Sequence, residues 1–190
     1  MRNYITGEVK ALIGVWSKPR TAAHAIDQGI VRHFYQAAGD VNPLYWDEEY
    51  AKQSKYGGLV APALYPGFSF ALGDGMPDPL EGKGSDPDYT GFEPESDARG
   101  FAPTLPPLPI RLERGLNAGT EHEVYQLPKI GDHITVKNRY SNIVQKQGKS
   151  GTLIFYTLET IHTNQAGEVL LVTRWTQVAR PVEEHDEGRE

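Results

Sequence analysis

Residues 132–179 have the sequence DHITVKNRYSNIVQKQGKSGTLIFYTLETIHTNQAGEVLLVTRWTQVA, in which apolar and polar side chains alternate over long stretches. The alternation, as at Ile134 and Val136, has the period of a strand that buries one face. Turns containing Gly148 and Gly167 interrupt it, so the flanking strands are expected to pair as hairpins. The pattern predicts an antiparallel meander with strands at 119–126, 132–144, 150–162 and 168–179.

A helix is expected before this sheet, at residues 21–38. Ile26, Ile30 and Phe34 recur there at helical spacing and form one apolar face. Gly39 follows the last periodic residue, as is typical of a helix C-cap. A sheet that buries one face needs a covering element, and this helix is the natural candidate. We therefore expect an α+β chain in which this apolar face fills the sheet.

Three other segments complete the expected architecture. A short helix is predicted at 47–55, whose first turn is acidic, as the helix dipole favours. An apolar helix is predicted at 64–72, with Pro66 near its start. The apolar segment 5–16 is expected to be a strand or an extended lead-in.

Two segments lack periodicity. Residues 73–109 form a long stretch rich in Gly, Pro and Asp, which is typical of either a functional lid or disorder. Its aromatic residues, Tyr89, Phe92 and Phe101, could pack if it is a lid. The acidic tail at 181–190 is expected to be a solvated end.

The composition is that of one globular domain spanning residues 1–190. The chain has 190 residues and a formal net charge of −6, which argues against a nucleic-acid partner. It contains no cysteine, which excludes disulfides and thiolate metal sites and fits a cytoplasmic protein. No segment resembles a signal peptide or reaches the roughly 18 apolar residues of a membrane helix. We expect a soluble chain without a membrane partner.

The segment 35–51, YQAAGDVNPLYWDEEYA, carries the candidate chemistry. Taken alone, its Gly-Asp-x-Asn-Pro core predicts a helix stop followed by an Asx-Pro turn. The whole segment also resembles the hydratase motif of the MaoC-like family, Gly-Asp-x-Asn-Pro-x-His followed by an acidic residue. Gly39, Asp40 and Asn42 match that motif, whereas Tyr45 stands where the family has its catalytic His.

The resemblance continues at 56–63, YGGLVAPA, and at 112–119, LERGLNAG. Its details resemble in particular the FAS1-like dehydratase subgroup. The resemblance implies a hot-dog fold, an antiparallel β-sheet wrapped around a central helix. We expect at least a dimer, because a single hot-dog sheet leaves an exposed edge and an uncovered pocket mouth. The partner is either a second copy, giving a homodimer, or a catalytically complete MaoC-like subunit, since members of this subgroup often lack the catalytic pair.

The resemblance implies an acyl-CoA or acyl-carrier thioester as ligand, with no further cofactor and no metal. Hydrating an enoyl thioester needs a base, an acid and donors for the enolate-like oxygen. By analogy Asp40 accepts a proton, Asn42 orients water and Tyr45 donates a hydrogen bond, although a tyrosine pKa of about 10 makes it a poor acid–base partner. Substrate-binding roles are expected for Gly58, Val60, Ala63 and Trp46.

Three functional alternatives remain open at this point. The chain could be a hydratase or dehydratase that works alone, the non-catalytic acyl-CoA-binding half of a heteromeric hydratase, or a hot-dog thioesterase. The missing His favours the second alternative, the non-catalytic half of a heteromeric hydratase. A metal centre is not expected, because the histidines show no ligand spacing.

Overall fold

The computed structural model describes residues 2–68, 85, 105–112, 115–149 and 151–182. Its described strands form one antiparallel sheet in the order β1-β3-β4-β5-β2. The elements, in chain order, are α1 (Gly7–Leu12), β1 (Arg20–Thr21), α2 (Gln28–Ala38), η1 (Pro43–Tyr45), α3 (Glu48–Gln53), η2 (Tyr65–Phe68), β2 (Leu116–Val124), β3 (Thr135–Gly148), β4 (Gly151–Thr163) and β5 (Val169–Ala179). Within the described residues, no helix is long and apolar enough to span a membrane.

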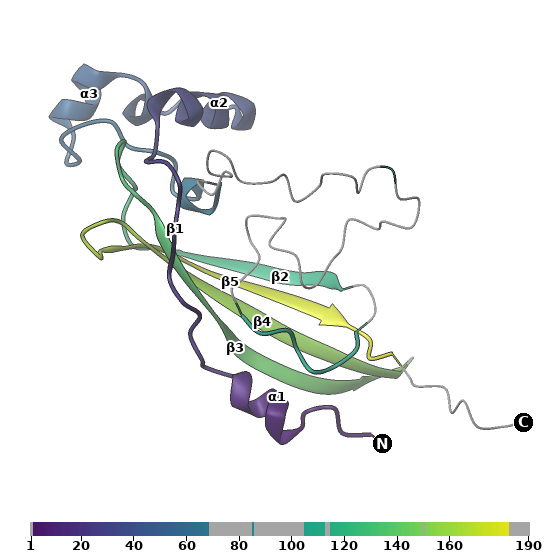
Figure 1. The fold of residues 1–190 in the computed structure, drawn as a ribbon. Coiled ribbons are helices and arrows are strands. Elements are labelled where there is room, and N and C mark those ends of the chain that lie inside the picture. The colour runs from purple at the N-terminus through teal and green to yellow at the C-terminus, as the bar shows by residue number, and fades with distance from the viewer. Residues whose placement is uncertain (1, 69–84, 86–104, 113–114, 150, 183–190) are drawn as a thin grey trace, which may run out of the picture.

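The four predicted strands are all present, with bounds shifted by a few residues. The predicted α+β class is therefore confirmed. Figure 1 shows α2 and α3 together beyond one end of the sheet, while α1 lies beside β3, far from them. The site motif thus sits at the end of the sheet where β3 and β5 begin.

The first buried cluster joins α2 to that end of the sheet. Val31 and Tyr35 of α2 pack with Ile134, Val136 and Leu170, and Ile26 belongs to the same cluster. Burying such side chains stabilises a fold by roughly 1.5–3 kcal/mol each, so the cluster fixes the position of α2. A second cluster packs Val9 of α1 on the sheet.

The prediction that Ile26, Ile30 and Phe34 form the buried face of α2 is only partly correct, because Ile30 is 55% exposed. The helix begins later than predicted, since the Asp27 carboxylate caps it by accepting hydrogen bonds from the Gly29 and Ile30 amides at 2.8 and 3.2 Å. Ile26 therefore precedes the helix and is held to the sheet end by a backbone hydrogen bond to Asp132. The rotation of α2 is set instead by Val31 and Tyr35.

The segment 5–16 differs from the predicted strand or extended lead-in. It contains helix α1, whose first turn is capped by the Thr6 hydroxyl. The Thr6 cap and the burial of Val9 stabilise this helix, although the apolar composition of the segment is typical of a strand. An isolated parallel bridge between Ile13 and Tyr140 is what remains of strand pairing there.

Other expectations fall partly or wholly outside the described residues. Of the helix predicted at 64–72, the structure describes the single 3₁₀ turn η2. Of the 73–109 segment it describes residue 85 and the stretch from 105, where Leu105 and Leu108 pack in the second cluster. The aromatic residues proposed for a lid, and the acidic tail from 183 onward, lie outside the described residues.

Candidate functional site

The polar residues of the motif lie in the turn that follows α2. Gly39 ends the helix in the left-handed conformation, with φ of 68°. The Asp40 amide donates to the Tyr35 carbonyl at 2.9 Å, and the Asp40 carboxylate accepts from the Asn42 amide at 3.1 Å. The Asn42 side chain accepts from the Leu44 amide at 3.1 Å and caps η1. The motif therefore forms the helix stop and Asx-Pro turn expected from its residue types.

This turn brings the three predicted catalytic residues together. Tyr45 is buried and interacts through its side chain with both Asp40 and Asn42. Burial and then the negative charge of Asp40 raise the pKa of Tyr45, and the hydrogen bond with Asn42 opposes them. Tyr45 therefore keeps its proton at neutral pH. It can donate a hydrogen bond, but it cannot serve as the base that a histidine would supply.

The predicted substrate-binding residues lie in two places. Val60 is fully buried in the first cluster, and its amide donates to the Leu44 carbonyl at 3.2 Å, which ties it to the motif turn. Gly58 and Ala63 are half-buried. The Ala63 amide has no hydrogen-bond partner within the described part of the chain, so it is available as a donor.

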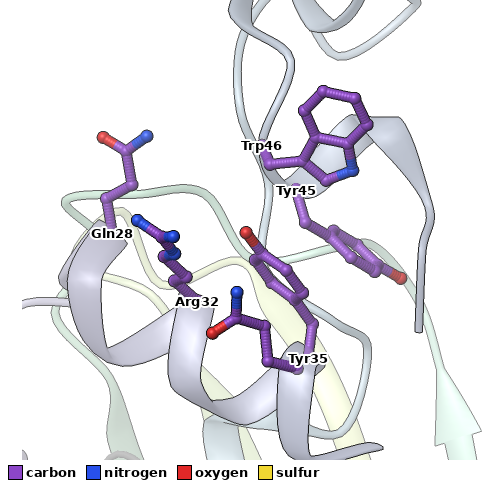
Figure 2. Close-up of a pocket in the computed structure, with 6 residues that line it drawn as sticks. Gln28, Arg32, Tyr35, Tyr45 and Trp46 are labelled. Carbon is purple, nitrogen blue, oxygen red and sulfur yellow. The ribbon is translucent and has the colours of Figure 1, made fainter. Parts of the chain in front are cut away.

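Trp46 borders a pocket rather than the core. Its indole is 52% exposed, and its N–H donates to the Val41 carbonyl at 3.4 Å. The pocket has a volume of about 310 Å³ and lies between α2 and the motif turn (Figure 2), lined by Gln28, Arg32, Tyr35, Gln36, Tyr45 and Trp46. Sequence reasoning identified Tyr45 and Trp46 but missed the four residues of α2. The other three follow Gln28 by four, seven and eight residues, which places them on one helix face, and this spacing was the available signal.

The histidines take no part in the site. Among the described residues, no group of His, Asp and Glu is arranged to hold a metal ion. His162 on β4 is buried, and its Nδ1–H donates to the Leu171 carbonyl at 3.3 Å. Burial lowers the pKa of His162 to about 4, so its ring is neutral in the folded protein.

A polar row crosses the sheet away from the site. Glu159 on β4 is 5% exposed, and its two oxygens accept from the Nε atoms of Arg139 and Arg174, each at 2.7 Å. Glu159 is paired in register with Arg139 on β3 and Arg174 on β5. We call this row the ion-pair ladder. The central carboxylate can be buried because each of its two oxygens accepts a hydrogen bond from an arginine.

Comparison with known proteins bears on this arrangement of motif and sheet. The model of the FAS1-like dehydratase domain region matches residues 11–173. The chain belongs to the FAS1-like dehydratase region family. The predicted membership of the MaoC-like family, in its FAS1-like dehydratase subgroup, is thereby confirmed.

Two curated relatives extend over most of this FAS1-like dehydratase domain. This chain is 27% identical over 173 residues to a probable enoyl-CoA hydratase alpha subunit of Thermomonospora curvata, and the alignment covers 83% of this chain. The alignment spans 46% of that subunit, so the chain accounts for about half of its length. This chain is also 30% identical over 169 residues to a UPF0336 protein of Streptomyces coelicolor, and the alignment covers 88% of this chain and 93% of the relative.

Solved structures confirm the hot-dog fold. The ChsH1–ChsH2 complex of Mycobacterium tuberculosis contains a chain that matches with a TM-score of 0.63 and 19% identity, over 92% of this chain and 94% of that one. A MaoC-like dehydratase of Rhodospirillum rubrum matches with a TM-score of 0.55 and 19% identity, over 90% and 94%. A chain of the 3R-hydroxyacyl-ACP dehydratase HadBC of Mycobacterium tuberculosis matches with a TM-score of 0.54 and 15% identity, over 88% and 96%.

Proposed function

We propose that this FAS1-like dehydratase domain binds an acyl thioester and forms one half of a two-subunit hydratase or dehydratase, whose other half supplies a complete acid–base pair. The observation that carries the proposal is the state of Tyr45. Its raised pKa leaves a hydrogen-bond donor, and no acid–base group, at the position of the family's catalytic His. Acyl thioesters remain the substrate class because Asp40, Asn42 and the Ala63 amide keep the polar groups of the motif.

The reaction needs more than these groups provide. Hydration adds the oxygen of water to the β-carbon and a proton to the α-carbon of an enoyl thioester, so one group must accept a proton and another must deliver one. Asp40 can accept a proton, although one of its oxygens already holds the turn at Asn42. Tyr45 gives up its proton reluctantly, because burial and the neighbouring carboxylate penalise the phenolate. A second subunit with a complete acid–base pair supplies what is lacking.

The sheet offers a place for that subunit. The edge strand β2 pairs with β5 on one side, and all of its nine residues are exposed. A long exposed edge presents unpaired amides and carbonyls, which another sheet edge can satisfy. The named assemblies among the structural neighbours, ChsH1–ChsH2 and HadBC, are complexes of more than one chain. We infer that β2 forms the contact with the partner subunit or with a second copy.

A complementation assay tests the proposal. The purified chain alone should turn over crotonyl-CoA slowly or not at all, and adding a complete MaoC-like partner subunit should give hydration that depends on this chain. The loss of enoyl absorbance follows the hydratase, whereas release of free thiol would reveal a thioesterase. Fast hydration by the chain alone, or thiol release without hydration, would refute the two-subunit account.

A further inference from the structure

Strand β2 is the last strand of the sheet in the part of the chain that the structure describes. Figure 1 shows it at the edge away from β3 and α1, and all nine of its residues are exposed. The irregularity in its register with β5 lies between Asn117 and Gly119, so residues 119–124 present a regular run of main chain. An antiparallel strand that is paired on one side directs every second amide and carbonyl to the other side, where a further strand can satisfy them.

The two ends of β2 carry large apolar side chains that are exposed to water. Leu116 is 66% exposed and Val124 is 46% exposed, and Tyr125, directly after the strand, is 57% exposed. An edge strand that must stay unpaired is protected by charges, short length or proline rather than flanked by such side chains. Their position therefore favours burial of the β2 edge in an interface.

The charges on one face of the sheet alternate as far as β2. The ion-pair ladder places a cation, an anion and a cation in register on β3, β4 and β5, namely Arg139, Glu159 and Arg174. On β2 the residue opposite Arg174 is Glu121. Glu123 lies on the same face, two residues along, and its carboxylate pairs with the Arg174 guanidinium at 3.2 Å. Two carboxylates of β2 thus stand beside one arginine.

Glu121 is the carboxylate of this pair that lacks a counterion. Its side chain has no ion-pair or hydrogen-bond partner among the described residues. Arg174 is already engaged, by Glu159 at 2.7 Å and by Glu123 at 3.2 Å. Opposite charges that face each other across a strand pair are stabilising, and like charges are destabilising. A cation is therefore the side chain that suits the position opposite Glu121 on an added strand.

A second copy of this chain cannot supply that cation. Residues 116–124 read LNAGTEHEV and contain no Lys or Arg, and His122 lies on the opposite face from Glu121. Two β2 strands that pair antiparallel about a two-fold axis set residues of the same face opposite each other. Depending on the register, Glu121 would then face Gly119, Glu121 or Glu123 of the other copy. None of these compensates its charge, and two of them place carboxylates together.

We propose that β2 selects its partner by charge: it pairs with a different chain whose edge strand carries Lys or Arg opposite Glu121, and it rejects a second copy of itself. The inference rests on the proposed function, because it specifies which kind of subunit can occupy the β2 edge. The pair between Glu121 and the partner's cation fixes the register, and the contacts between glutamates in a self-pair provide the repulsion that specificity requires. The alternation of charge then continues from this sheet into that of the partner.

Reversing the charge of Glu121 tests the inference with the chain itself as the probe. Sedimentation equilibrium measures the association of the full-length wild type, of Glu121→Lys, and of their equimolar mixture. The wild type alone should associate most weakly, because none of its self-pairs contains a cation. If Glu121 faces its own counterpart, the mixture gains an opposite-charge pair, and if it faces Glu123, the variant alone gains two. One of these samples should therefore associate about 10-fold or more tightly than the wild type, the scale of one close charge pair.

Glu8→Lys is the matched control. Glu8 is an exposed carboxylate on α1, which lies beside β3 at the other edge of the sheet (Figure 1). This variant changes the net charge equally but should associate as weakly as the wild type. The gain from Glu121→Lys should also disappear in about 1 M salt, where the screening length is about 3 Å. Glu121→Gln removes the repulsion without adding a cation, so its gain should be smaller.

Three results would overturn the inference. The first is wild-type self-association as tight as that of any sample containing Glu121→Lys. The second is an equal gain from Glu8→Lys, which would be an effect of net charge. The third is a lack of association in every sample, which would make the glutamates of β2 a barrier to any pairing. The complementation assay measures turnover and decides the proposed function separately, so its failure beside the expected association refutes the proposed function alone.

Discussion

The ring of Tyr45 stacks on the ring of Tyr35, with centroids 6.0 Å apart and planes 30° from parallel. Tyr35 belongs to α2 and Tyr45 to η1, so this contact spans the turn that contains Asp40 and Asn42. Both rings are buried in the cluster that joins α2 to the sheet. The turn is thus held from one side by its own hydrogen bonds and from the other by two aromatic side chains.

Removing the Tyr35 ring should therefore destabilise the whole end of the molecule. Tyr35→Ala is expected to lower the free energy of unfolding by about 3 kcal/mol, as for other large aromatic truncations in a core. Tyr35→Phe keeps the ring and should change it by less than about 1 kcal/mol. Urea unfolding of the three proteins measures the difference. Equal stability of the alanine and phenylalanine variants would show that the stack contributes nothing.

The ion-pair ladder on the sheet gives a second prediction. Glu159→Gln removes the carboxylate that Arg139 and Arg174 share and leaves Arg174 with its ion pair to Glu123 at 3.2 Å alone, so it should cost about 2–4 kcal/mol of stability. Glu121→Gln is the matched control, because Glu121 occupies the neighbouring position of the same row on β2 but is exposed. Its loss should cost under about 1 kcal/mol. Thermal unfolding with similar midpoints for both variants would contradict the buried role of Glu159.

His162 should make stability depend on pH. Its pKa is about 4 in the folded protein, below its ordinary 6.5, so the folded state favours the neutral ring. The unfolded chain takes up the proton below pH 6.5, so this stabilisation is complete above that pH and is lost as the pH falls toward 4. The slope is about 1.4 kcal/mol per pH unit in that window.

Denaturant unfolding between pH 7.5 and 4.5 measures this contribution. The stability difference between wild type and His162→Gln should shrink by roughly 2 kcal/mol over the range. A difference that stays constant with pH would exclude His162 as the group responsible.

The sequence allowed the sheet and the motif turn to be predicted for clear physical reasons. Alternation of side chains and turns at glycines are local signals, and all four strands lie within a few residues of the predicted bounds. Gly39, Asp40 and Asn42 also act through neighbours in the sequence, so their turn was predictable from residue types alone.

Features that depend on distant contacts were missed. The rotation of α2 is set by packing against Ile134 and Leu170, more than 90 residues away, and so Ile30 was wrongly assigned to the core. The α2 side of the pocket was missed for the same reason. Helix α1 was missed because a six-residue element has little periodicity, and its Thr6 cap was the available sign.

Hydration of crotonyl-CoA by the purified chain, measured for the wild type, Tyr45→His and Tyr45→His with Asp40→Asn, tests the central claim most directly. The account predicts almost no turnover by the wild type, because Tyr45 keeps its proton. Tyr45→His should raise the rate, on the order of the 10²–10⁴ that one acid–base group contributes, and the added Asp40→Asn should abolish the gain. Strong wild-type turnover that is lost in Tyr45→Phe would contradict the account, since it would make Tyr45 the working acid.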